Sequence, residues 1–195
     1  MAISMEQIRD LRAQTGAGIV DVKEALTESG GDAQKAITWL REKGKATAAK
    51  KADRETKEGV VGVYVHGNNK IAAMVSLSCE TDFVARTERF QELARDLAMH
   101  VAALDPLVVN PADMPEAEVE AERELAMKQG KESGKPEEIV AKMVEGKLKK
   151  FKEERALMTQ SFVKDPNQTV EQLVNAAIQE LGENITIQSF TRQSI

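Results

Sequence analysis

Three short amphipathic segments open the chain. Apolar residues recur in them at helical spacing, and glycine-containing turns separate them. The first segment begins at Ser4, which has the capping-box spacing to Gln7, and the third begins at Asp32. Gly44 is expected to end the third helix. This pattern predicts a compact three-helix bundle over residues 1–45.

The apolar periodicity is lost over residues 46–57, where lysine and alanine predominate. We interpret this stretch as a helical or frayed linker between the bundle and a second domain, residues 58–195. Its lysines could contact nucleic acid or an acidic partner, but such a run is more often a solvated face.

Strand periodicity follows the linker. Valines occupy alternate positions in residues 59–67, Asn-rich turn residues come next, and alternation resumes in residues 70–79. This pattern is typical of a β-hairpin. Residues 184–192 alternate in the same way, so we expect them to complete a small antiparallel sheet of three strands.

Helical patterns surround these strands. Residues 83–104 carry a continuous apolar stripe and predict one long helix across the hairpin. Two charged segments with narrow stripes, within residues 116–155, predict an antiparallel helical hairpin that either protrudes or lies flat on the sheet. Residues 130–135 are the expected joint between them. A last helix is expected to begin at Thr169 and end at Gly182. The predicted fold class is α+β, with helices covering one face of the sheet.

The rest of the chain is organised around Leu77–Arg86, where the strand pattern ends in a short polar turn. Thr81 or Asp82 can accept N–H bonds from the first turn of the next helix. Phe83 follows directly, and two interpretations of it remain open. A large aromatic residue is usually buried, which would make Phe83 part of the core. Alternatively, it is an anchor presented to a pocket of a partner protein.

Composition narrows the function further. The 195 residues carry a net charge of −5, which argues against general nucleic-acid binding. Cys79 is the single cysteine, which excludes an intramolecular disulfide and fits a cytoplasmic protein. The sequence has neither an apolar run of membrane length nor a signal-peptide pattern, so we expect no membrane association.

Catalytic patterns are lacking in the sequence. The two histidines, His66 and His100, do not begin a zinc-spaced cluster, and His66 is expected at the opposite end of the hairpin from Cys79. There is no phosphate-binding loop of the G-x-x-x-x-G-K-[ST] type. We therefore predict a protein that acts by binding, without enzymatic chemistry, metal or cofactor.

The run Cys79–Arg86, CETDFVAR, resembles the core signature of the bacterial translation elongation factor Ts family. Near the N-terminus, Leu11-Arg12, Thr15–Gly18, Asp21–Lys23 and Ala25-Leu26 resemble that family's first signature. The resemblance extends over nearly the whole chain through Gly146–Phe151, Phe162–Asp165 and Gly182–Ile185. Two positions depart from it: Ser78 stands where the family usually has Asn, and Ser161 where it often has Pro.

This resemblance implies a guanine-nucleotide exchange factor for elongation factor Tu, the GTPase that carries aminoacyl-tRNA. It also implies that the bundle is of the ubiquitin-associated (UBA-like) type and that the helical hairpin protrudes. The chain has one core module where longer members have two, which implies the short form that associates as a homodimer. An exposed edge or bare face of a three-stranded sheet favours the same conclusion.

The resemblance also implies contact residues for elongation factor Tu. Phe83 would enter between helices of the GTPase domain and disturb its magnesium and phosphate site, with Asp82 making a polar contact beside it. Thr81 would shape the turn and Val84 would pack next to Phe83. From the bundle, the implied contacts are Arg12 and Ile19.

Two other classes of function remain open from the sequence. The bundle could be a peptide- or ubiquitin-binding module, with the charged hairpin as a scaffold or chaperone arm. An RNA-binding role would depend on Lys43–Lys57 alone, and few aromatic residues lie nearby for base stacking.

Overall fold

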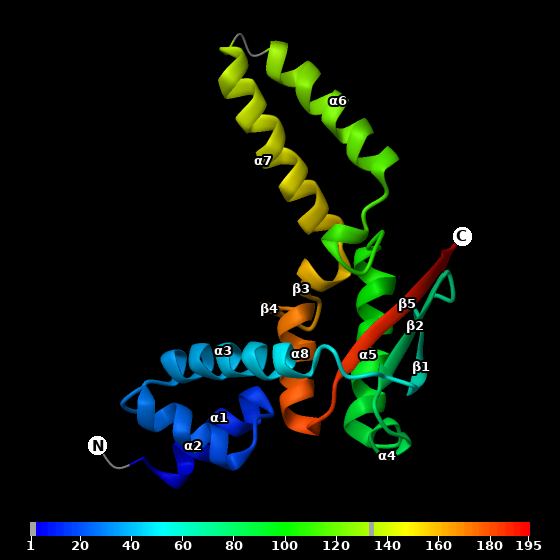
Figure 1. Ribbon diagram of the computed structural model, residues 1–195. Helices are drawn as coiled ribbons and strands as arrows, with labels where there is room; N and C mark the ends of the chain where they lie inside the picture. The colour runs from blue at the N-terminus through cyan, green and yellow to red at the C-terminus, as the bar shows by residue number, and fades with distance from the viewer. Residues whose placement is uncertain (1–2, 133–134) are drawn as a thin grey trace.

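The computed structural model describes residues 3–132 and 135–195, and the fold is α+β, as the sequence predicts. Figure 1 shows a bundle of α1–α3 at one end, a hairpin of α6 and α7 projecting at the other, and a core of sheet and helices between them. The helices are α1 (Met5–Thr15), α2 (Ile19–Glu28), α3 (Ala33–Lys51), α4 (Asp82–Ala85), α5 (Glu88–Leu104), α6 (Glu116–Glu132), α7 (Glu137–Arg155) and α8 (Val170–Leu181). The strands are β1 (Glu58–Val65), β2 (Ile71–Cys79), β3 (Ser161–Phe162), β4 (Asp165–Thr169) and β5 (Ile185–Ser194).

The bundle begins with the capping box that the sequence predicts. The Ser4 hydroxyl oxygen accepts from the N–H of Gln7, and the side-chain oxygen of Gln7 accepts from the N–H of Ser4. Its helices enclose an apolar cluster that includes Leu11, Val22 and Leu26. The predicted end of the third helix at Gly44 is wrong, because α3 continues to Lys51. Good helix formers follow Gly44, and this glycine lies where α3 crosses α8. A Cβ there would lie 3.2 Å from the side chain of Gln179.

The main sheet has the order β1-β2-β5, and both pairings are antiparallel. Helix α5 packs along one face and buries its apolar stripe there, with α8 beside it. The closest approach is at Gly62 in β1, where any Cβ would collide with the main chain of Ala94 in α5. The core of the molecule therefore lies between the sheet and these two helices.

The predicted single helix over residues 83–104 is wrong. It is broken into α4 and α5 at Arg86 and Thr87. The Thr87 hydroxyl oxygen accepts from the N–H of Phe90 at 3.3 Å, which caps α5, and the hydroxyl donates to the carbonyl of Val84 at 2.8 Å. A polar cap therefore overrides the nearly continuous apolar stripe.

Helices α6 and α7 lie antiparallel and extend away from the core (Figure 1). A narrow seam of Ala126, Val140, Val144 and Leu148 joins them, and Gly130 leaves the space that Val140 occupies. The sequence suggests residues 130–135 as the joint, but α6 continues to Glu132, and residues 133–134 lie outside the described part of the chain.

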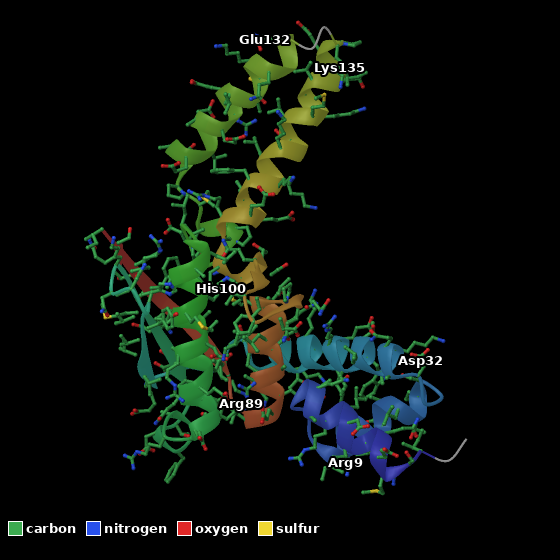
Figure 2. All side chains as sticks on the ribbon, turned by 180° about the vertical axis from the view of Figure 1, so that it is seen from behind. Arg9, Asp32, Arg89, His100, Glu132 and Lys135 are labelled. Atoms are coloured by element: carbon green, nitrogen blue, oxygen red, sulfur yellow. The ribbon has the colours of Figure 1, made fainter. Side chains whose placement is uncertain are left out.

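His100 is completely buried in α5, near the base of this hairpin (Figure 2). Its Nδ1 accepts from the N–H of Val163 at 3.2 Å, which leaves Nε2 to donate to the side chain of Gln160 at 3.0 Å. Gln160 in turn donates to the carbonyl of Glu154 at the end of α7. Burial lowers the pKa of His100, so this network holds a neutral ring.

Candidate functional site

The turn between β2 and α4 brings together four of the predicted site residues. Thr81 caps α4 by accepting from the N–H of Val84 at 3.4 Å. Asp82 begins the helix and forms an ion pair with Arg86 at 2.9 Å. Val84 packs partly against the main core. The backbone of this turn is therefore fixed by a cap and by one apolar side chain.

Phe83 lies at the tip of the turn with 79 % of its surface exposed. The interpretation that it is buried as part of the core is therefore wrong. The aromatic residue that does fill the core is Phe90, which is 0 % exposed. A large exposed aromatic residue on an ordered turn is the arrangement expected of an interface anchor.

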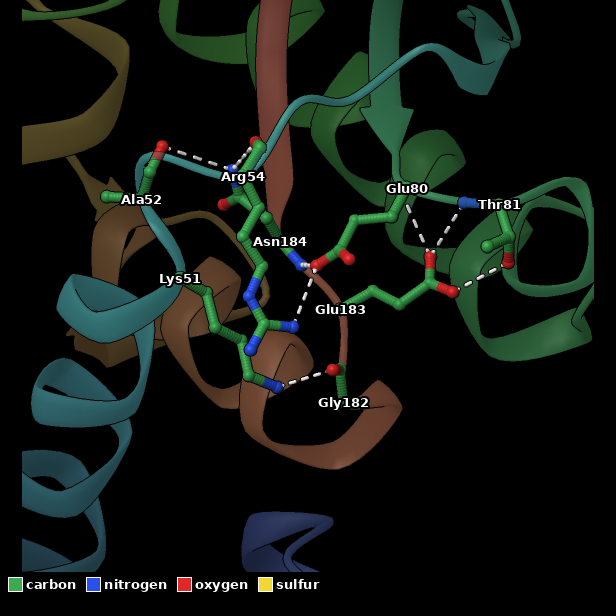
Figure 3. A network of polar contacts seen from close by, with 8 residues as sticks. All are labelled: Lys51, Ala52, Arg54, Glu80, Thr81, Gly182, Glu183 and Asn184. Atoms are coloured by element: carbon green, nitrogen blue, oxygen red, sulfur yellow. Dashed lines mark hydrogen bonds and ion pairs between the residues drawn. The ribbon is translucent and has the colours of Figure 1, made fainter.

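Two carboxylates, which the sequence reasoning did not select, hold this turn (Figure 3). Glu183, in the loop between α8 and β5, accepts from the N–H groups of Glu80 and Thr81, each at 3.0 Å, and from the hydroxyl of Thr81 at 2.6 Å. Glu80 accepts from the N–H of Asn184 at 2.7 Å. In the sequence, the stretch Gly182–Ile185 shows a helix stop, a strand start and the family resemblance, and none of these indicates the bonds of Glu183.

The other two predicted site residues lie apart from the turn. Arg12 is exposed near the end of α1, and Ile19 begins α2 with 54 % of its surface exposed. Val20 beside it is 77 % exposed, so the start of α2 presents two neighbouring aliphatic side chains. The bundle and α4 both lie at the end of the molecule opposite the α6–α7 hairpin (Figures 1 and 2).

The model of the family described as elongation factor TS matches residues 6–195. This chain belongs to the elongation factor Ts family. Elongation factor Ts of Herpetosiphon aurantiacus is 53 % identical over 192 residues, which cover 98 % of this chain and 97 % of that protein. Elongation factor Ts of Rubrobacter xylanophilus is 50 % identical over 195 residues, the full length of both chains.

Cys79, the first residue of the run CETDFVAR, is fully buried at the end of β2. Its thiol donates to the carbonyl of Thr81 at 3.2 Å. Burial raises the pKa of Cys79 to about 11, and the charge of Glu183 adds to this effect. The thiolate is therefore disfavoured, and Cys79 is better suited to packing than to nucleophilic chemistry.

A cleft of about 740 Å³ lies between the bundle of this family member and its core, and α3 and α8 contribute to its wall. The arginines at its wall are engaged within the chain: Arg41 donates to the carbonyl of Asn167 at 3.0 Å, and Arg89 to Glu180 at 2.8 Å. In the described part of the chain, no three His, Cys, Asp or Glu side chains are grouped to hold a metal ion. Nor does any described helix have the length and apolarity to cross a membrane.

Proposed function

We propose that the chain is a guanine-nucleotide exchange factor that binds elongation factor Tu and accelerates GDP release. The observation that carries this proposal is the exposed ring of Phe83 on a turn whose main chain is hydrogen-bonded to Glu183. An aromatic side chain that is exposed in the free protein and held by an ordered backbone loses little entropy when it enters a pocket.

The mechanism follows from thermodynamic linkage. A factor that binds the nucleotide-free GTPase more tightly than the GDP-bound form must weaken GDP binding by the same ratio. GDP in such a GTPase is held by main-chain amides, a lysine and a magnesium ion. If Phe83 enters between helices of the GTPase, with Asp82 making a polar contact beside it, the magnesium site is disturbed and the phosphate charge is left poorly neutralised.

The bundle supplies the second contact in this proposal. Residues 1–45 form a UBA-like docking unit, which residues 46–57 join to the core domain, residues 58–195. Arg12 and Ile19 contact the same GTPase, and the exposure of Ile19 and Val20 supports this assignment. Docking through the bundle would hold the GTPase while the Phe83 turn acts on its nucleotide site.

A homodimer is the third part of the proposal. The face of the sheet away from α5 carries Val61, Val63 and Val65 from β1 and Met74 from β2, all between 48 % and 59 % exposed. The β5 positions paired on the same face are Ser, Thr and Gln. Within the described residues this face has no charged side chain and no helix over it. A second copy could cover it through a self-complementary, two-fold interface.

The test of exchange is the release of a fluorescent GDP analogue from elongation factor Tu. We expect sub-stoichiometric amounts of this protein to increase the release rate, because one molecule serves many GTPase molecules. An unchanged release rate, with the folded protein and its cognate GTPase, would contradict the proposed function.

A further inference from the structure

We propose that Glu183 is a positioning residue for Phe83, because its carboxylate holds the turn in the orientation that presents the ring. This inference rests on the function proposed above and deepens it. Glu183 lies 100 residues further along the chain and comes from a different element, so the turn is held from outside its own segment.

The ring of Phe83 makes few contacts of its own, so its direction is set by the main chain on either side of it. Its own side chain is 79 % exposed, and α4 is a single turn of four residues. The neighbouring ion pair of Asp82 with Arg86 is also largely exposed, and pairs of that kind contribute little to order. Val84 and Ala85 pack at the core directly after Phe83. The main chain directly before it, at Glu80 and Thr81, is the part of the turn that Glu183 holds.

The carboxylate of Glu183 is matched to the hydrogen-bond donors of Glu80 and Thr81. A carboxylate only accepts hydrogen bonds, and it meets three donors here: the N–H of Glu80 and both the N–H and the hydroxyl of Thr81. Since the hydroxyl of Thr81 gives its one proton to Glu183, its oxygen remains free to accept from Val84. Glu183 thus also fixes the cap of α4.

A second set of bonds makes the support mutual. Glu80 accepts from the N–H of Asn184 at 2.7 Å and pairs with Arg54 at 3.5 Å. Each loop therefore uses a glutamate side chain to hold the main chain of the other (Figure 3). Because charged groups with complete hydrogen bonding are costly to displace, the two loops should move as one body.

The same loop also holds the chain that leaves the bundle. Asn184 is 5 % exposed and donates to the carbonyls of Arg54 at 2.8 Å and Ala52 at 3.3 Å. Lys51, the last residue of α3, donates to the carbonyl of Gly182 at 2.5 Å. Residues 182–184 are therefore a common support for the Phe83 turn and for the end of α3.

The substitution Glu183→Gln tests the inference at nearly constant shape. The glutamine side chain has one acceptor oxygen where the glutamate has two, and an NH₂ group takes the place of the other. The three donors of Glu80 and Thr81 can then no longer all be satisfied as they are by the carboxylate. GDP release from elongation factor Tu is measured over a range of concentrations of the factor. We expect the maximal release rate to fall about tenfold, and the factor concentration that gives half of this rate to change by less than about twofold. A purely structural defect would instead reduce the folded fraction, which raises the apparent half-saturating concentration and leaves the maximal rate unchanged.

A double substitution asks whether Glu183 acts through Phe83. In the Phe83→Ala background, Glu183→Gln should cause no further loss of maximal rate, because there is no ring left to position. The matched control is Glu180→Gln, three residues earlier, which removes the same charge but bonds to Arg89 rather than to the turn. This control should keep the wild-type maximal rate.

Hydrogen exchange at single amides gives a readout that does not depend on the GTPase. In Glu183→Gln the amides of Glu80, Thr81 and Val84 should exchange faster than in the wild type, while amides of α5 stay protected. Unchanged amide exchange, or a wild-type maximal release rate in Glu183→Gln while Phe83→Ala is impaired, would overturn the role of Glu183 and leave the proposed function standing. If the wild-type protein itself does not accelerate GDP release, the proposed function fails, and the role of Glu183 in it fails as well.

Discussion

Phe83 and Phe90 are seven residues apart and have opposite environments: Phe83 is 79 % exposed and Phe90 is 0 % exposed. In one continuous helix this spacing would place both rings on the same face. The break at Thr87 changes the direction of the chain between them, so that Phe90 faces the core and Phe83 faces solvent. The two residues therefore provide a direct comparison of the proposed interface anchor with a core side chain.

We expect Phe83→Ala to change the free energy of unfolding by no more than about 0.5 kcal/mol, because the ring is mostly exposed. Its maximal GDP-release rate should fall about 30-fold or more, the effect of removing a strong interface anchor. Phe90→Ala, the comparison, should lose about 3–5 kcal/mol of stability. Urea titration and GDP-release kinetics measure the two effects separately. An unfolded Phe83→Ala protein would show that the ring supports the core.

The contrast between these residues also explains what the sequence could predict. Strand alternation and helical stripes predict the α+β class, the sheet of three strands and most element limits, because those signals are local. The break at Thr87 was missed because the apolar stripe continues across it. The end of α3 was missed because Gly44 is a common helix stop, and only its packing against Gln179 of α8 reveals its actual role.

The hydrogen bonds that hold the Phe83 turn could not be predicted from the sequence, for a different reason. The bonds of Glu183 to Thr81 join residues about 100 positions apart, and neither residue carries a periodic signal for that contact. The sequence did identify the turn residues themselves and left the cap open between Thr81 and Asp82, of which the structure selects Thr81. Contacts made by side chains across elements depend on the assembled fold, whereas caps depend on a few neighbouring residues.

The proposed contact between the bundle and the GTPase predicts a kinetic effect different from that of Phe83. Ile19 is 54 % exposed, so Ile19→Ala should leave the fold intact. The variant should lose about 1 kcal/mol of binding free energy and raise the half-saturating concentration about fivefold, with an unchanged maximal rate. GDP-release rates measured over a range of factor concentrations test this. A fall in maximal rate without a change in half-saturation would contradict a docking role for the bundle.

The bare sheet face predicts a charge-sensitive dimer. Val63 lies on the edge strand β1 and is 52 % exposed, so Val63→Lys should be tolerated in the monomer. In a face-to-face dimer the same lysine would be buried without a partner, and we expect the mass in solution to fall from twice the chain mass to 21.4 kDa. Ile139→Lys, at a similarly exposed site on the α6–α7 hairpin, is the control. Light scattering that gives a monomer for the wild type would contradict the dimer.

His100 predicts how stability depends on pH. Burial lowers its native pKa below the ordinary value of 6.5, whereas the unfolded chain takes up a proton near that value. The contribution of neutral His100 to stability is therefore fully present above pH 6.5. It is lost as the pH falls through 6.5 toward the native pKa, because only the unfolded state binds the proton in that window.

We accordingly expect the free energy of unfolding to decrease by up to about 1.4 kcal/mol per pH unit below pH 6.5, before most carboxylates titrate. His100→Gln should be less stable at every pH but should lose this slope between pH 7 and about 5.5. His66→Gln removes the exposed histidine of the hairpin turn and should retain the slope. Denaturant titrations across this range measure the effect. A flat wild-type profile, or a slope that persists in His100→Gln, would mean that the bonds to Gln160 and Val163 do not keep the ring neutral.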